Sequence, residues 1–220
     1  MDPVVRARGL VKDYGRGRAA RRILDGVDLD VAAGELVAVV GRSGCGKSTL
    51  LHLLGGLDTS DAGTVEIAGE RLDGRRADAV RRRRVGFVFQ AFHLVPELTG
   101  AENVLLAARL PGARPGARER ARALVTRLGL DEVAGGLPHE LSGGEQQRLA
   151  VARAVVNDPA VLLADEPTGN LDEASGAVVL DLLRELAGDG RAVVVVTHER
   201  TVTARADRVV TLREGRLAAA

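Results

Sequence analysis

The stretch that most constrains the fold of this chain runs from Glu35 to Thr49. It opens with a short apolar run, Leu36 to Val40, which is typical of a strand buried on both faces. Glycines follow at positions 41, 44 and 46, and Lys47 and Ser48 then introduce an apolar pattern of helical period. A G-x-x-x-x-G-K-S pattern between a strand and a helix is the arrangement of a phosphate-binding loop, so the sequence predicts a nucleotide-binding α/β domain.

The residue types of this loop explain why it would bind phosphate. Glycines let backbone N–H groups converge on an anion, and the start of a helix adds its positive dipole end. Lys47 is expected to reach the β- and γ-phosphates, and the Ser48 hydroxyl to ligate Mg²⁺. A glycine-rich turn with an incidental Lys-Ser pair is the alternative. The predicted nucleotide-binding residues of the loop are Gly41, Arg42, Ser43, Gly44, Cys45, Gly46, Lys47, Ser48 and Thr49.

The composition limits the class of protein. A chain of 220 residues is long enough for one domain with its own core, and 45% hydrophobic with 28% charged residues is ordinary for a globular protein. A net charge of +1 argues against bulk electrostatic binding of nucleic acid. The lone Cys45 fits a reducing compartment, and no apolar run has the length of a membrane span. We therefore expect a cytoplasmic protein that reaches any membrane through a partner.

The region before the loop is predicted to form a small antiparallel sheet, which a strand after the loop joins. Val4 to Leu10 is expected as an edge strand and Ile23 to Val31 as a second strand. Thr64 to Ile67 is expected as the strand that joins them. Tyr14, the only tyrosine, is expected in a polar loop. It is either a surface aromatic that packs on its own loop or a ring that stacks on an adenine base.

A further strand is predicted at Val85 to Phe89, between two polar features. The run of arginines from Arg81 to Arg84 is either a solvated helix face or a contact for phosphate or a partner. Gln90 follows the strand directly, and its amide either caps the strand end or ligates Mg²⁺ and positions water.

The segment from about residue 91 to 157 is predicted to be helical and inserted between two core strands. Thr99 and Glu102 have the spacing of a capping box that opens a helix, and Pro111-Gly112 is expected to end it. Ala117 to Leu128 is predicted as a second helix.

A third helix of this segment opens at Leu141-Ser-Gly-Gly-Glu-Gln-Gln-Arg148. Ser142 and Glu145 again have capping-box spacing, so Ser142 is at least a helix cap. Gly143 and Gly144 also leave backbone N–H groups exposed at a helix start, which suits a phosphate. The chain therefore contains two candidate anion-binding helix starts.

Two more buried strands are predicted to end in polar groups. One is predicted over Val161 to Glu166 and ends in the two carboxylates Asp165 and Glu166, and the other, Arg191 to Val196, is followed by Thr197 and His198. Ligands sit at the carboxyl ends of parallel strands, so Asp165 is expected to hold Mg²⁺, Glu166 to orient or polarise the attacking water, and His198 to contact the γ-phosphate. The alternatives are a solvated strand end and a structural histidine.

The ordered set of motifs resembles the ATP-binding subunits of ABC transporters over essentially the whole chain. In this resemblance Tyr14 matches the adenine-stacking loop, Gly41 to Thr49 matches the Walker A loop, and Gln90 matches the Q-loop. Leu141 to Arg148 matches the family signature, and Val161 to Glu166 matches the Walker B strand. Asn170 to Asp172 matches the D-loop, and His198 matches the switch histidine. The resemblance implies a single domain over residues 1–220 with a P-loop NTPase (RecA-like) core, an N-terminal antiparallel β subdomain and an inserted α-helical subdomain at about 91–157.

Two segments are similar to one branch of this family, the lipoprotein-releasing, macrolide-export and cell-division ATPases. They are Phe89 to Thr99 and Asp165 to Asp172. The resemblance implies an ATPase subunit on the inner face of the cell membrane that binds ATP and Mg²⁺, drives a four-span permease with a large extracytoplasmic domain, and does not bind nucleic acid. Glu199 follows His198 where the family often has Asp.

The family scheme also implies a homodimer in the ATP-bound state, in which the helix start at Ser142 to Gly144 of one chain completes the γ-phosphate pocket of the other. In that scheme the catalytic residues are Lys47, Gln90, Glu166 and His198, the Mg²⁺ ligands are Ser48, Gln90 and Asp165, and Tyr14, Ser142, Gly143, Gly144 and Glu145 join the loop in binding the nucleotide.

Three alternatives to an export motor remain. The first is an ATP-switch subunit of a cell-division type complex that signals without transport, and the second is an importer ATPase. A nucleic-acid-linked ATPase of this family is the third, but the repair type needs a long coiled coil and the translation-factor type needs two cassettes. This sequence contains neither feature.

Overall fold

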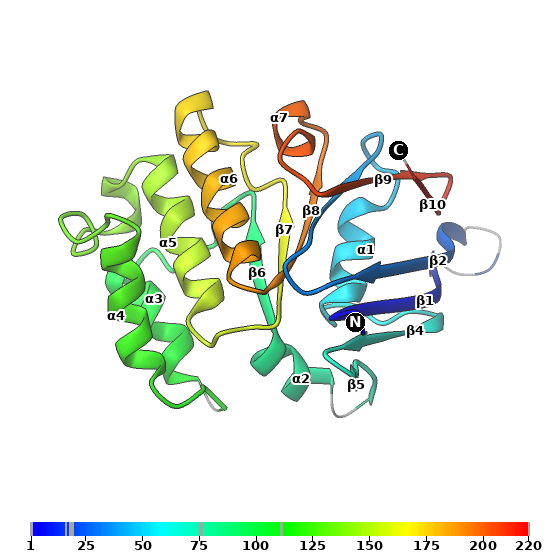
Figure 1. Ribbon diagram of the computed structural model, residues 1–220, viewed down its shortest axis with the longest axis horizontal. Coiled ribbons are helices and arrows are strands. Elements are labelled where there is room, and N and C mark those ends of the chain that lie inside the picture. The colour runs from blue at the N-terminus through cyan, green and yellow to red at the C-terminus, as the bar shows by residue number, and fades with distance from the viewer. Residues whose placement is uncertain (1, 16, 18–19, 75–76, 111, 220) are drawn as a thin grey trace.

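The computed structural model describes residues 2–15, 17, 20–74, 77–110 and 112–219. Its strands form a four-stranded sheet of order β2-β1-β4-β5 and a six-stranded sheet of order β10-β9-β3-β8-β7-β6 (Figure 1). The strands are β1 (Val5–Tyr14), β2 (Arg21–Val31), β3 (Leu36–Val40), β4 (Ala62–Ile67), β5 (Glu70–Arg71), β6 (Val85–Phe89), β7 (Val161–Asp165), β8 (Ala192–Thr197), β9 (Arg208–Arg213) and β10 (Arg216–Ala219). The helices are α1 (Lys47–Leu54), α2 (Ala77–Arg84), α3 (Gly100–Arg109), α4 (Ala117–Arg127), the short 3₁₀ helix η3 (Pro138–Glu140), α5 (Gly143–Val155), α6 (Glu173–Gly188) and α7 (Arg200–Thr203).

The six-stranded sheet is parallel except for β10, which pairs antiparallel with β9. Its central strands β3, β8 and β7 are the continuous apolar runs of the sequence, and they are buried along almost their entire length. This is the pattern expected for strands covered on both faces. The strands predicted at 36–40 and 85–89 are confirmed, and the strand predicted at 161–166 ends one residue earlier, at Asp165.

Helices α1 and α5 lie on opposite faces of this sheet. Val194 and Val196 of β8 pack in a cluster with the buried leucines of α1 and the antiparallel sheet. Val193 and Val195, which point the other way, pack with α5 and α6. Figure 1 shows the same division, with α1 on one side of β7 and β8 and α5 on the other.

Helices α3, α4 and α5 follow one another between β6 and β7, as predicted, and share a hydrophobic cluster of their own. The capping box at Thr99 and Glu102 is present at the start of α3. That helix ends at Arg109, and Pro111 lies outside the described residues. Helix α4 ends at Arg127, one residue earlier than expected.

Two predictions for the antiparallel sheet are wrong. The first strand is not an edge strand, because β1 pairs with β2 on one side and with β4 on the other. It also extends to Tyr14, so this residue ends a strand and does not lie in a loop. Neither feature was predictable from the weak alternation of apolar and polar residues, because a bulge in the pairing around Gly9 interrupts the two-residue period of the strand.

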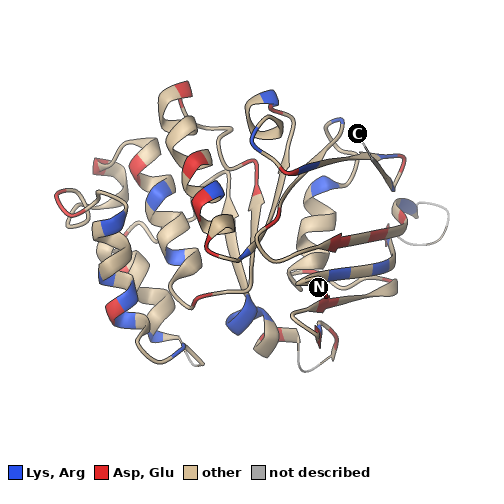
Figure 2. Cartoon of the chain, viewed as in Figure 1, with Lys and Arg blue, Asp and Glu red and all other residues tan. Residues whose placement is uncertain are grey.

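The arginine run forms the last turn of α2 and contacts the protein itself. Arg81 donates to the carbonyl of Gly56 at 2.7 Å, and Arg83 and Arg84 form ion pairs with Glu70. Acidic and basic residues both occur over the helices and the antiparallel sheet, and the end of α2 is entirely basic (Figure 2). Among the described residues, no helix combines the length and apolar character needed to cross a membrane.

Candidate active site

Three neighbouring strands bring the predicted site residues to one edge of the large sheet. In the parallel register, Val40 of β3 lies opposite Thr197 of β8, and Asp165 of β7 lies opposite Val196. The segments that follow these ends carry the glycine-rich loop, His198 and Glu166. The structure therefore assembles the nucleotide loop, the carboxylates and the histidine as expected for the carboxyl edge of such a sheet.

The glycine-rich loop is shaped by close backbone contacts. A Cβ at Gly41 would lie 2.5 Å from the carbonyl oxygen of Leu212, and one at Gly46 would lie 2.7 Å from a methyl group of Ile23. Gly46 caps α1 with a φ of +106° and, as a glycine, supplies no side-chain cap to the first turn of the helix. The N–H groups of this turn are thus left without a side-chain cap, which is the condition for binding an anion there.

Lys47 places a charge inside this loop. The residue is buried, and its ammonium group donates to the carbonyl of Gly41 at 3.0 Å and to that of Arg42 at 3.4 Å. These carbonyls are neutral, and no described carboxylate forms an ion pair with the ammonium group. Arg42, Ser43 and Gly44 are exposed, Cys45 is half-buried, and Tyr14, Ile23, Gly44, Gly46, Lys47, Ser48 and Thr49 line one pocket beside the loop.

Ser48 and Asp165 meet across the sheet edge. The Ser48 hydroxyl donates to the Asp165 carboxylate at 3.1 Å. Burial raises the pKa of Asp165, although the hydrogen bond from Ser48 acts in the opposite direction. A half-buried carboxylate that is costly to ionise alone is well suited to a cation, so this pair fits Mg²⁺.

Gln90 is not brought to that pair. Its amide donates to Asn170 at 3.1 Å, and the Asn170 amide donates to the Gln90 carbonyl at 3.0 Å. The Q-loop residue is thus tied to the segment after β7 and does not hydrogen-bond to Ser48 or Asp165.

Glu166 and His198 form an acid–base pair. The histidine Nδ1 lies 3.0 Å from Glu166 Oε1, while Glu166 Oε2 is buried and has no hydrogen-bond partner among the described residues. The hydrogen bond and the charge of Glu166 raise the pKa of His198. Glu166 also has a φ of +45°, a conformation that non-glycine residues rarely adopt and that is enriched at functional sites.

The second helix start is built differently and lies elsewhere. Ser142 accepts from the Glu145 N–H at 3.3 Å, and Glu145 accepts from the Ser142 N–H at 2.8 Å. These bonds lower the pKa of Glu145. Since α5 and α1 cover opposite faces of the sheet, the chain does not bring Ser142, Gly143 and Gly144 to its own phosphate loop.

Sequence reasoning missed Lys12, Asp58 and Gln147. Gln147 is fully buried on α5 and donates to the carbonyl of Pro167, next to Glu166, at 2.5 Å. Lys12 is buried and bonds to Asp58, which also accepts from the Tyr14 hydroxyl. Lys12 had a signal: it and Lys47 are the only lysines among 31 basic residues. Asp58 and Gln147 had none, because their roles depend on tertiary contacts.

Residues 24–169 match the ABC transporter family. The chain belongs to this family. The family assignment and the expected P-loop fold class, with its antiparallel sheet and inserted helices, are therefore confirmed. The lipoprotein-releasing system ATP-binding protein LolD of Ruegeria pomeroyi is 53% identical, over 99% of this chain and 98% of that protein.

Other relatives of this ABC transporter chain are longer. The macrolide export ATP-binding/permease protein MacB of Nitrosomonas europaea is 48% identical over 100% of this chain but only 34% of that protein. The chain thus spans about a third of the length of the MacB relatives that it matches. A solved dimer of the ATP-binding cassette MJ0796, bound to ADP and Pi after hydrolysis, is 38% identical and has a TM-score of 0.86 over 98% of both chains.

Proposed function

We propose that this chain is the ATP-hydrolysing motor subunit of an ABC transporter that drives a membrane permease. The observation that carries the proposal is that three features lie at one edge of the large sheet. They are the start of α1, which has no side-chain cap, the Ser48–Asp165 pair and the Glu166–His198 pair. These are the groups that phosphoryl transfer to water requires: phosphate ligands, a metal site and a base. The two relatives described above are named as ATP-binding proteins of export or release systems.

In this proposal the chain positions the triphosphate and a water molecule. The ammonium of Lys47 and the first N–H groups of α1 bind the β- and γ-phosphates. Ser48 and Asp165 would hold Mg²⁺, which neutralises charge on the phosphate oxygens when it is bound. The unpaired Glu166 Oε2 accepts the proton of the attacking water, and His198 holds the other carboxylate oxygen in place.

Gln90 would join this site only by exchanging its partner. Its amide would leave Asn170 and turn toward the Mg²⁺ site when the nucleotide binds. Because Gln90 directly follows β6, that exchange would move the segment that leads into the helices α3 to α5. This supports Gln90 as the residue that relays the nucleotide state to the permease.

The two helix starts support a homodimer in the ATP-bound state. Within one chain, α1 and α5 lie on opposite faces of the sheet, so a second chain must supply the Ser142–Gly144 turn to the γ-phosphate. A two-fold arrangement would then form two equivalent sites. The dimeric state of the MJ0796 cassette supports this proposal.

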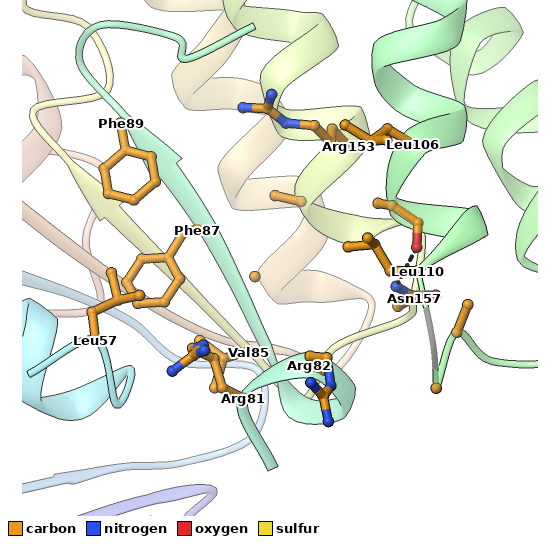
Figure 3. Close-up of a pocket in the computed structure, with 15 residues that line it drawn as sticks. Leu57, Arg81, Arg82, Val85, Phe87, Phe89, Leu106, Leu110, Arg153 and Asn157 are labelled. Atoms are coloured by element: carbon orange, nitrogen blue, oxygen red, sulfur yellow. Dashed lines mark hydrogen bonds between the residues drawn. The ribbon is translucent and has the colours of Figure 1, made fainter. Parts of the chain in front are cut away.

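The permease would contact the groove beside β6 (Figure 3). Phe87 and Phe89 stack along its floor with ring centroids 5.5 Å apart, and Leu57 and Leu110 on its walls are exposed. Arg81, Arg82 and Arg153 also line the groove, which has a volume of about 320 Å³. An apolar segment of the permease with a neighbouring carboxylate fits this surface. The chain would then lie on the inner face of the membrane, against a permease that we expect to have four spans and a large extracytoplasmic domain.

The test is a pull-down from native membranes with tagged Glu166→Gln protein, ATP and Mg²⁺. Mass spectrometry should identify a four-span permease with a large outer domain, and Leu110→Lys should abolish its recovery. Val178→Lys is the matched control, because Val178 is an equally exposed apolar residue outside the groove, and should retain the permease. A many-span permease with a solute-binding protein would instead indicate an importer. Recovery of cell-wall hydrolase regulators would indicate a switch subunit. Recovery of no membrane partner, while the wild-type protein hydrolyses ATP, would contradict the transporter role.

A further inference from the structure

A buried lysine and a carboxylate hold the only tyrosine of the chain. Tyr14 is 44% exposed at the end of β1, so packing alone does not fix its ring. Its hydroxyl donates to Asp58 Oδ2 at 2.7 Å, and the ammonium of Lys12 lies over the ring, 5.1 Å from its centroid. The ring is therefore held at its far end by a hydrogen bond and on one face by a cation.

Asp58 joins these two contacts. Its Oδ1 accepts from Lys12 at 2.8 Å, and Lys12 also donates to the carbonyl of Thr59 at 2.7 Å. Burial lowers the pKa of Lys12, but the bond to Asp58 and its charge raise it by more, so the ammonium stays charged. Asp58 comes just after α1, the helix that begins with the phosphate loop. The tyrosine is thus bonded to the segment that directly follows the helix of the phosphate site.

We propose that Asp58 is a positioning residue for the base of the nucleotide: together with Lys12 it fixes the Tyr14 ring so that one face remains for the base. The inference rests on the proposed ATP-binding function. Tyr14 lines the pocket beside Gly44, Gly46 and Thr49, so a ring held in this orientation stands next to the phosphate loop. A ring that is already held in place loses no side-chain conformational entropy when an aromatic base stacks on it. The gain in affinity therefore applies only to ligands that have a base.

A structural role makes different predictions from a positioning role. In the Lys12–Asp58 pair the Asp58 side chain is 30% exposed and the Lys12 side chain 10%, so water partly screens the carboxylate, and its replacement by an amide of the same shape should leave the fold intact. Its loss should therefore weaken binding of a nucleotide that has a base while leaving the phosphate loop intact. Inorganic tripolyphosphate, which has no base, separates the two effects.

The experiment measures kcat and KM for ATP, together with inhibition by tripolyphosphate, in Asp58→Asn, Tyr14→Ala and the double variant. Asp58→Asn should raise KM for ATP about fivefold, within the range of stacking contributions, with kcat changed less than twofold. Inhibition by tripolyphosphate should be unchanged. In the Tyr14→Ala background, Asp58→Asn should have no further effect, because the ring that it positions is gone.

Asp61→Asn is the matched control. Asp61 lies on the same turn and accepts from the backbone N–H of Asp13 at 2.6 Å without contacting Tyr14, so this variant should keep the wild-type KM. An equal loss of tripolyphosphate binding in Asp58→Asn, or an undiminished effect in the Tyr14→Ala background, would overturn the inference and leave the proposed function standing. A wild-type protein that does not hydrolyse ATP would overturn the proposed function itself.

Discussion

The starts of α1 and α5 are both glycine-containing turns, and they satisfy their N–H groups in opposite ways. The turn at Gly46 has no side-chain cap and is surrounded by groups of its own chain, among them Lys47 and the Ser48–Asp165 pair. At α5, the capping box satisfies the N–H groups of Ser142 and Glu145, and leaves those of Gly143 and Gly144 without a side-chain cap. The first start thus carries a nearly complete phosphate site, whereas the second is a stable helix end that lacks a ligand in its own chain. The comparison teaches that one chain holds both parts of an ATP site but cannot bring them together.

The largest effect should come from the first start. Lys47→Ala removes the buried ammonium of the phosphate loop and should lower ATP hydrolysis about 10²- to 10³-fold, with ATP binding weakened in parallel. Arg213→Ala is the control, because this arginine is exposed and, among the described residues, forms an ion pair with the neighbouring Glu214 alone. Steady-state ATPase assays and nucleotide titration measure the effect. Normal ATP binding by Lys47→Ala would place the phosphates elsewhere.

A smaller and separable effect is expected at the second start. Ser142→Ala removes a helix cap worth about 1 kcal/mol, which lowers Tm by about 2–4 °C in a chain of this size. It should also lower ATP hydrolysis by up to about tenfold, because the γ-phosphate of the partner chain loses a hydrogen-bond donor. ATP binding to the monomer should be unchanged.

Thr99→Ala is the matched control for that variant, since Thr99 and Glu102 form the same capping box at the start of α3. Calorimetry should give a similar loss of Tm, and the ATPase rate should stay within twofold of wild type. An equal loss of hydrolysis in both variants would mean that the Ser142 effect is one of stability alone.

The smallest effect concerns the Glu166–His198 pair, which lies at the sheet edge beside the start of α1 and has no counterpart at the start of α5. The neighbouring Glu166 raises the pKa of His198 above its ordinary value near 6.5. The pair therefore favours the folded state at low pH, and this contribution is lost as the pH rises through the raised pKa. NMR titration should find a raised pKa for His198, and Glu166→Gln should lower it. An unchanged titration in that variant would show that the 3.0 Å contact does not persist in solution.

The sequence predicted the large sheet and its functional edge well because their signals are local. Continuous apolar runs that end in Asp165 or precede His198 identify central parallel strands directly. Contacts between distant segments were not predictable in this way. The bonds of Gln90 to Asn170, and of Asp58 to Lys12 and Tyr14, join residues 44 or more positions apart. The pairing of β1 on both sides was not predictable because a bulge breaks the alternation of that strand.

The central claim is that ATP joins the two helix starts across a dimer. Glu166→Gln removes the proposed base but keeps the shape of the site, so bound ATP should persist and hold two chains together. Light scattering on this variant should give twice the mass of one chain with ATP and Mg²⁺, and the mass of one chain with ADP. A single-chain mass at saturating ATP and Mg²⁺ would contradict the account.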